Sequence, residues 1–166
     1  MTETATPLVP SASDYAACEA ERPVVVDTRR GLIEYAERGE GMPLLSLHGS
    51  PAAFENGLFI AGFARVNGFR VIAPSRPGYG RTPLETGRTP LELADALAAL
   101  LDTLGLEQVA VVGMSGGGPA GYALAGAHPD RGCCLLQVES IALPATAPVA
   151  GASACASPAW PGWPRG

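Results

Sequence analysis

Short apolar runs alternate with amphipathic stretches along most of this chain. Residues 42–49, 70–74, 108–113 and 133–138 are apolar runs of the length typical of strands that are buried on both faces. Residues 23–28 and 32–37 are separated by Arg29, Arg30 and Gly31, and they predict a β-hairpin. Between these runs, residues 56–68, 89–105 and 117–127 have the spacing or composition of helices.

The stretch 89–105 carries the strongest helix signals. Thr89 and Glu92 have the spacing of a capping box, Pro90 occupies the first helical position, and Gly105 supplies a C-terminal stop. This segment therefore predicts an amphipathic helix that packs on the core. Its apolar stripe consists of Leu93, Leu97, Leu100, Leu101 and Leu104.

From residue 42 onward, the expected strands alternate with the expected helices. Parallel strands that are joined through helices need right-handed crossovers, so this pattern predicts an α/β fold with a mostly parallel sheet. The 166 residues suffice for one domain. We expect its core at residues 23–141, after a flexible segment at residues 1–22.

The composition changes after residue 141. Residues 142–166 are dominated by Ala, Pro and Gly, carry one charged residue, Arg165, and show neither helical nor strand periodicity. This composition predicts a disordered tail. A GC-rich gene that is read out of frame yields the same composition, and the sequence leaves both explanations open.

Charge and hydropathy argue against nucleic-acid binding and against a membrane protein. The hydrophobic fraction of 47% fits a globular domain, and the net charge of −5 argues against a nucleic-acid surface or a polybasic membrane patch. The N-terminus lacks a signal-peptide pattern, and no run reaches the ~18 apolar residues of a membrane span, so we expect a cytoplasmic protein. The four cysteines have no metal-ligand spacing, and no metal or organic cofactor is expected.

Residues 111–121, VVGMSGGGPAG, place a serine in a setting typical of a nucleophile. Gly113, Ser115 and Gly117 fit the pattern G-x-S-x-G between an expected strand and an expected helix. Small residues two positions from the serine allow the strand and the helix to close on each other. At the start of the helix, Gly116 directs a backbone N–H toward the space beside the Ser115 hydroxyl, which gives one half of an oxyanion hole.

Two further motifs precede this turn. The sequence H-G-S-P at residues 48–51 directly follows a buried strand, so the Ser50 N–H is a candidate for the second oxyanion donor. The sequence R-P-G-Y-G at residues 76–80 follows the next strand. With these three motifs in this order, residues 24–139 resemble the N-terminal part of the α/β-hydrolase fold family.

The resemblance implies a fold and a chemistry. The fold is a mostly parallel sheet with flanking helices, whose C-terminal strands are missing from this chain. Ser115 is implied as the nucleophile and the N–H groups of Ser50 and Gly116 as oxyanion donors, with support from His48, Gly49, Gly113 and Gly117. A serine nucleophile favours small-molecule esters or amides as substrates, because aspartate is the usual nucleophile of the members that act on epoxides and halides.

A nucleophilic serine needs a base, and in this family an acid and then a histidine follow the serine along the chain. After Ser115 the chain has one histidine, His128, which lies about 18 Å away along the expected helix. We expect His48 at the rim of the site, where it shapes the loop. Glu139 has the position of a triad acid, but it has no role without a histidine to orient. The sequence thus predicts a nucleophile and an oxyanion hole without a base.

This gap leaves two alternatives open. In the first alternative, the chain is a truncated hydrolase without activity or a binding remnant. If the C-terminal strands are missing, residues 133–138 form an exposed apolar sheet edge, which predicts self-association. The second alternative is a dinucleotide-binding unit, since residues 116–121 match G-x-G-x-x-G and Glu139 lies about 20 residues further on. That alternative leaves the H-G-S-P and R-P-G-Y-G motifs unexplained.

Overall fold

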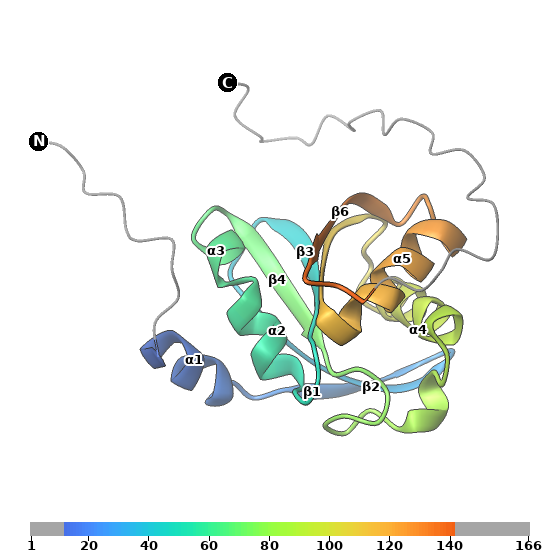
Figure 1. Ribbon diagram of the computed structural model, residues 1–166, viewed down its shortest axis with the longest axis horizontal. Helices are drawn as coiled ribbons and strands as arrows, with labels where there is room; N and C mark the ends of the chain where they lie inside the picture. The colour runs from blue at the N-terminus through green and yellow to red at the C-terminus, as the bar shows by residue number, and fades with distance from the viewer. Residues whose placement is uncertain (1–11, 142–166) are drawn as a thin grey trace, which may run out of the picture.

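A six-stranded sheet forms the centre of residues 12–141, the part of the chain that the computed structural model describes. Its strands are β1 (Val24–Thr28), β2 (Gly31–Arg38), β3 (Met42–Leu47), β4 (Phe69–Pro74), β5 (Val109–Met114) and β6 (Gly132–Val138). They lie in the order β1-β2-β4-β3-β5-β6 (Figure 1). β2 pairs antiparallel with β1 and with β4, whereas β4, β3, β5 and β6 run parallel. The α/β fold with a mostly parallel sheet is confirmed.

Helices cover both faces of this sheet (Figure 1). One face carries α1 (Ala12–Glu19), α2 (Phe54–Ile60) and α3 (Gly62–Arg65), and the other carries α4 (Pro90–Thr103) and α5 (Gly118–Ala127). Two short 3-10 turns, η1 (Leu84–Thr86) and η2 (Ser115–Gly117), precede α4 and α5. The chain therefore forms three layers, with the sheet in the middle.

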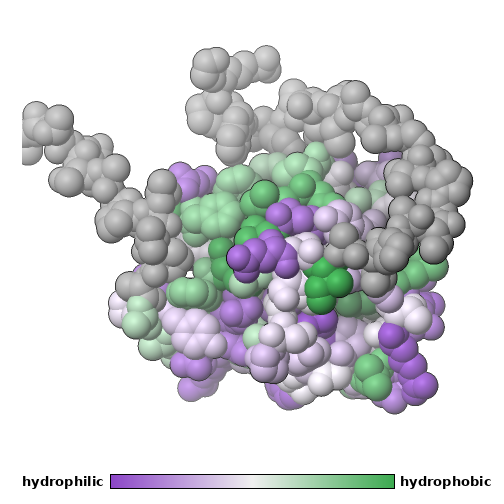
Figure 2. Space-filling model, viewed as in Figure 1, coloured by the Kyte–Doolittle hydropathy of each residue, from purple (hydrophilic) through white to green (hydrophobic). Residues whose placement is uncertain are grey.

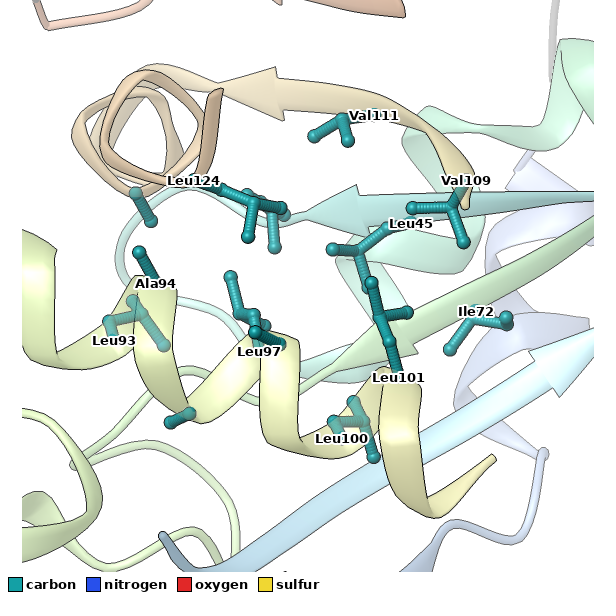
Figure 3. Packing of buried hydrophobic residues seen from close by; sticks show 14 of the residues in the cluster. Leu45, Ile72, Leu93, Ala94, Leu97, Leu100, Leu101, Val109, Val111 and Leu124 are labelled. Atoms are coloured by element: carbon teal, nitrogen blue, oxygen red, sulfur yellow. The ribbon is translucent and has the colours of Figure 1, made fainter. Parts of the chain in front are cut away.

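The alternation of side chains along β3 explains why a separate apolar core lies on each face. Leu45 and Leu47 pack into the cluster beneath α4 and α5, and Leu44 packs into the cluster beneath α1, α2 and α3. The buried leucines of α4 face the sheet around Leu45 and Ile72 (Figure 3); they are Leu93, Leu97, Leu100 and Leu101. Each fully buried leucine stabilises the fold by about 2 kcal/mol, so this helix anchors the sheet.

Local sequence signals predict several elements correctly. The hairpin is present as β1 and β2, which join through a turn between Thr28 and Gly31. The capping box at the start of α4 is present, with the Thr89 side chain accepting from the Glu92 N–H and the Glu92 side chain accepting from the Thr89 N–H. Gly105 has a φ of 67° just beyond α4, as a C-terminal stop requires.

Two helical regions differ from the prediction. The single helix expected at residues 56–68 is divided into α2 and α3 at Ala61, which is fully buried. Within residues 1–22, expected to be flexible, α1 forms and packs the Tyr15 ring edge-on against Phe59 at 5.1 Å. Cys18 of the same helix is buried. These tertiary contacts order a segment whose own sequence gives no strong helix signal.

The strand β6 forms one edge of the described sheet. Its apolar side chains are not all buried, since Leu136 is 50% exposed and Val138 is 37% exposed, as expected for an exposed apolar edge. Apolar side chains gather toward the top of the face seen in Figure 2, over β6 and β4. Self-association through this edge stays a prediction. The tail predicted at residues 142–166, like residues 1–11, lies outside the described residues.

Candidate active site

The sheet has a topological switch point at the carboxyl ends of β3 and β5. These strands are neighbours, but the chain leaves β3 toward α2 on one face and leaves β5 toward α5 on the other. Ligands of open α/β sheets bind at such a switch point. The H-G-S-P loop follows β3 and Ser115 follows β5, so the two motifs meet at this point.

Ser115 occupies a strained turn between β5 and α5. Its φ is 47°, a left-handed conformation that costs an L-residue with a side chain about 1–2 kcal/mol. The turn is closed on its inner side, since a Cβ at Gly117 would overlap the Leu47 carbonyl oxygen and lie 2.7 Å from that of His48. Glycine is therefore required at position 117, and the half-buried Ser115 is presented at the strand end.

The loop after β3 lies directly beside this serine. A Cβ on Gly49 would lie 3.3 Å from the Ser115 Cβ and 3.8 Å from its Oγ. Across the same gap, a Cβ on Gly116 would lie 3.0 Å from the Ser50 Oγ. Ser50, Gly116 and Ser115 are thus brought together, as the sequence predicts. The N–H of Gly116 lies in the first helical turn, where N–H groups have no acceptor within the helix.

Gly113, the remaining predicted support position, lies beside β6. A Cβ there would overlap the amide of Gln137, which donates from Nε2 to the Gly118 carbonyl at 3.1 Å. The chain after β6 also crosses the elbow. The Ser140 Oγ donates to the Gly113 carbonyl at 3.2 Å, and the Ile141 N–H donates to the Ser115 carbonyl at 3.1 Å. No sequence pattern predicted these contacts from residues 140 and 141.

His48 is completely buried, which corrects its expected place at the rim of the site. Its Nε2 accepts the backbone N–H of Arg76 at 2.9 Å, so the proton is on Nδ1, which donates to the Gly49 carbonyl at 2.6 Å. Burial lowers the pKa of His48 to about 4; the hydrogen bond to Gly49 opposes this shift, and the charge of Arg76 adds to it. The ring is therefore neutral, with both nitrogens occupied, and it is not free to accept the Ser115 proton.

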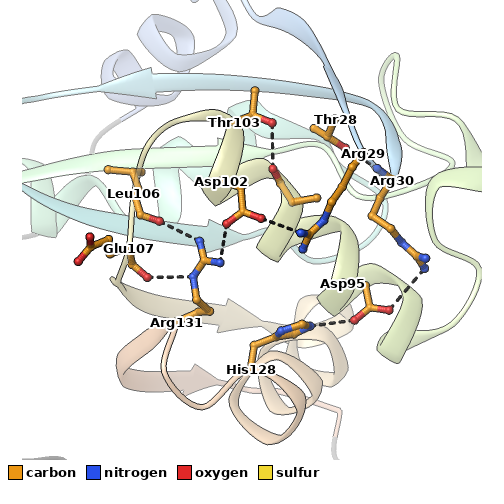
Figure 4. Close-up of polar contacts among 11 residues, drawn as sticks. Thr28, Arg29, Arg30, Asp95, Asp102, Thr103, Leu106, Glu107, His128 and Arg131 are labelled. Carbon is orange, nitrogen blue, oxygen red and sulfur yellow. Dashed lines mark hydrogen bonds and ion pairs between the residues drawn. The ribbon is translucent and has the colours of Figure 1, made fainter.

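His128 lies at the other end of α5, as expected (Figure 4). Its Nε2 donates to Asp95 Oδ1 at 2.8 Å, and the other oxygen of this carboxylate pairs with Arg30 at 3.5 Å. The ten residues of α5 separate this histidine from the elbow, a span of about 15 Å. Glu139, the candidate acid, is exposed just after β6. Neither residue contributes a base at Ser115.

Arg76 is the site residue that sequence reasoning missed. Its Nη1 donates to the Gly116 carbonyl at 2.9 Å, and its Nη2 donates to the Gly49 carbonyl at 3.0 Å and to the Ser50 Oγ at 2.6 Å. Its guanidinium carbon lies 4.9 Å from the centre of the Tyr79 ring. The R-P-G-Y-G motif marked this turn, but only the folded chain shows that the Arg76 side chain reaches both halves of the site.

Neither a metal-ligand cluster nor a membrane-spanning helix was found where the structure describes the chain. Residues 12–141 contain no group of three His, Cys, Asp or Glu side chains that could hold a metal ion. None of the helices in that range is long and apolar enough to cross a bilayer.

Known proteins are similar to this chain in sequence and in structure. A family model described as alpha/beta hydrolase fold matches residues 42–165. The chain is 38% identical to an uncharacterized hydrolase, YcgS, of Bacillus subtilis (strain 168), over 61% of this chain and 35% of that protein. It is 36% identical to a 2-hydroxymuconate semialdehyde hydrolase of Pseudomonas putida, over 63% of this chain and 38% of that protein.

Solved structures give the same result. An alpha/beta hydrolase fold protein from Nakamurella multipartita matches 72% of this chain and 42% of its own with a TM-score of 0.71 and 44% identity. Proteins named as a haloalkane dehalogenase and as epoxide hydrolases are also similar to this chain. The chain spans 35% to 42% of the length of the first three proteins compared here.

Proposed function

Because the chain belongs to the alpha/beta hydrolase fold family, we propose that it carries the nucleophilic half of a serine hydrolase site that acts on a small-molecule ester or amide. Ser115 is the nucleophile, and the N–H groups of Ser50 and Gly116 receive the oxyanion. The observation that carries the proposal is the strained conformation of Ser115 at the switch point, directly against Gly49. Strain at a half-buried serine is typical of functional turns.

The chemistry follows from these positions. The Ser115 Oγ attacks the substrate carbonyl carbon, the serine proton leaves to a base, and the carbonyl electron pair moves to oxygen. The two N–H groups stabilise that oxyanion. When the carbonyl reforms, the bond to the alcohol or amine breaks and the leaving group takes a proton, leaving an acyl-serine that water hydrolyses. The chain's two histidines do not serve as the base, so its own residues supply the nucleophile and the oxyanion donors.

Serine rather than aspartate at the elbow supports acyl transfer over the epoxide and halide chemistry named for some similar proteins. The dinucleotide alternative is not part of the proposal, because the glycine-rich turn is explained by the elbow: Gly117 is required by backbone contact with the loop after β3. Nucleic acid and membranes are not proposed as partners.

A second candidate function is binding of an ester without turnover. The observation that favours it is the engagement of both histidines, His48 with Gly49 and Arg76, and His128 with Asp95. In that case, the site recognises the acyl group but does not release a product.

Acetylation by p-nitrophenyl acetate separates these functions. Wild-type protein, Ser115→Ala and the matched control Ser13→Ala on α1 are compared for nitrophenolate release and by intact mass. Turnover faster than that of Ser115→Ala supports hydrolysis. The rate of Ser115→Ala is the baseline, because the oxyanion hole and binding alone leave a rate ~10³-fold above water. Stable acetylation of Ser115 without turnover supports the nucleophile and the slow loss of the acyl group. Equal behaviour of all three proteins overturns the proposal.

A further inference from the structure

We propose that Arg76 is a positioning residue for the oxyanion hole, fixing and polarising the peptide group whose N–H belongs to Ser50. The catalytic consequence rests on the proposed function, whereas the orientation of the peptide does not. Arg76 touches neither Ser115 nor a substrate in this arrangement. It acts through the carbonyl groups of the two segments that carry the oxyanion donors.

A single guanidinium joins these two segments. Nη2 donates to the Gly49 carbonyl on the loop after β3, and Nη1 donates to the Gly116 carbonyl on the turn after β5. The distances are 3.0 and 2.9 Å, which are ordinary for charged N–H donors. The planar fork of arginine can hold two acceptors at once, which a lysine ammonium does less well. Arg76 therefore joins the two segments that carry the donors, and of the two donor peptides it binds directly only the one that contains the Ser50 N–H.

The Gly49 carbonyl and the Ser50 N–H belong to the same planar peptide group, so fixing one end fixes the other. The carbonyl oxygen accepts from Arg76 Nη2 at 3.0 Å and from His48 Nδ1 at 2.6 Å. Both of its lone pairs are then in use. Rotation of this peptide would break two hydrogen bonds, and the direction of the Ser50 N–H is locked.

The other donor peptide is held in a similar way. The Ser115 carbonyl, which shares a peptide group with the Gly116 N–H, accepts the N–H of Ile141 at 3.1 Å. Only the Ser50 peptide, however, is held by a formal charge. A cation at a carbonyl oxygen draws electron density through the peptide and makes its N–H a stronger donor. The oxyanion hole is thus stronger on the Ser50 side.

The charge of Arg76 is uncompensated among the described residues. Within residues 12–141, no carboxylate forms an ion pair with it. Burial lowers the pKa of Arg76, yet an arginine stays protonated at neutral pH. The side chain is held by the face of Tyr79, and its backbone N–H is bound to His48 Nε2. A fixed positive charge without a counter-ion therefore stands behind the Gly49 carbonyl.

Phosphorylation of Ser115 by diethyl p-nitrophenyl phosphate tests the catalytic consequence. The Ser115 Oγ–P bond forms as the bond from phosphorus to p-nitrophenolate breaks, and the serine proton passes to the buffer. Charge that develops on the phosphoryl oxygen needs the oxyanion hole. The proteins compared are wild type, Arg76→Met, Arg76→Lys and the matched control Arg70→Met, whose arginine pairs with exposed Glu37.

We expect Arg76→Met to lower the second-order rate constant about tenfold to a hundredfold, less than the ~10²–10³-fold measured when an oxyanion donor itself is removed. Arg76→Lys lies between, Arg70→Met matches the wild type, and dilute guanidinium ion restores part of the rate of Arg76→Met. Equal rates in Arg76→Met and wild type overturn the inference. So does a loss that guanidinium fails to restore and that Arg70→Met shares.

Nuclear magnetic resonance of the same proteins gives a readout that needs no reaction. Losing the hydrogen bond from Arg76 moves the Gly49 carbonyl carbon and the Ser50 amide nitrogen upfield in Arg76→Met, with other backbone signals of the folded protein retained. If the wild type is not modified at Ser115, the proposed function fails, and these two signals still decide the inference: unmoved signals overturn it. If Arg76→Met does not fold, Arg76→Lys takes its place in both measurements.

Discussion

Arg76 and Arg81 lie at the two ends of one turn, but Arg81 forms an ion pair with a carboxylate and Arg76 does not. Arg81 Nε pairs with Glu34 Oε2 at 2.5 Å, and this carboxylate, whose side chain is only 4% exposed, also accepts the Ser75 Oγ at 2.8 Å. Arg76 has carbonyl and hydroxyl acceptors instead. A charge that meets its counter-ion stabilises the turn, whereas a charge without one is left to act on the site.

The neighbours of each end of the turn explain why only Arg81 has a carboxylate partner. Glu34 reaches the turn from β2. This strand pairs with β4 and lies away from the switch point between β3 and β5. The Glu34 N–H donates to the Thr82 Oγ1 at 2.9 Å, and the Ser75 N–H donates to the Glu34 carbonyl at 2.8 Å. The Arg81 end of the turn is therefore held by β2. At the other end, the Arg76 backbone N–H donates to the neutral ring of His48.

The largest expected effect is a loss of folding stability at low pH, caused by His48 at the Arg76 end of the turn. As the pH falls below 6.5, the ordinary pKa of histidine, the unfolded chain takes a proton at His48, while the folded protein keeps this ring neutral down to about 4. Stability is therefore full above pH 6.5 and falls by about 3 kcal/mol as the pH drops toward 4. Urea unfolding across this range measures it. His48→Asn should lose most of the slope; a flat wild-type profile contradicts the assignment.

The next effect belongs to the Arg81 end. Arg81→Met leaves the buried Glu34 carboxylate without its cation, and we expect the free energy of unfolding at pH 7 to fall by about 2 kcal/mol, somewhat less than for a fully buried pair because Arg81 is half exposed. Arg70→Met is the matched control, since its partner Glu37 is 41% exposed and should lose under ~0.5 kcal/mol. Urea unfolding compares the two. Adding Glu34→Gln to Arg81→Met should recover part of the loss, and equal losses in both arginine variants would count against the comparison.

A smaller effect separates the strained site from the relaxed parts of the chain. Ser115→Gly should be more stable than Ser115→Ala by about 1 kcal/mol, because only glycine adopts a φ of 47° without cost. At Tyr122, exposed in the middle of α5, the same pair of substitutions should have the opposite sign, since glycine is the weaker helix former. Thermal unfolding of the four variants checks this. An alanine variant at position 115 as stable as the glycine variant would show that the turn is not strained.

The smallest effect is on a single titration. The charge of Arg76 contributes to the lowered pKa of His48, so Arg76→Met should raise that pKa. Arg81→Met should leave it unchanged, because its charge is paired with Glu34. The ring proton signals of His48, followed by nuclear magnetic resonance against pH, provide the measurement. A shift of the same size in both variants would mean that His48 does not distinguish the two arginines.

Much of the fold is predictable because its signals are local. The capping box of Thr89 and Glu92, the glycine stop at Gly105 and the elbow motif around Ser115 each depend on a few neighbouring residues. The division of the helix at Ala61 was missed although Gly62 directly follows it, because the apolar spacing that predicted a helix continues through residues 56–68. The ordering of α1 depends on Phe59, a contact across more than 40 positions.

In the candidate site, too, the features set by neighbouring residues could be predicted, and those set by distant contacts could not. The proposed nucleophile and the proposed donor loop are predicted from motifs, since each motif is a short pattern of neighbouring residues. The role of Arg76 was not apparent, because its acceptors on Gly49 and Gly116 lie 27 and 40 positions away. The burial of His48 was missed for the same reason. Its Nε2 is occupied by a backbone N–H that comes from a different strand end.

The hydrogen bond from Ile141 to Ser115 makes one amide proton a reporter of the elbow. That proton exchanges with solvent only when the Ser115 carbonyl releases it, so its exchange rate follows the opening of the turn that presents Ser115. A ligand that tightens the elbow slows this exchange, and a distortion of β6 or of the residues after it speeds it. Ser115 and the end of the described chain thus share one opening equilibrium.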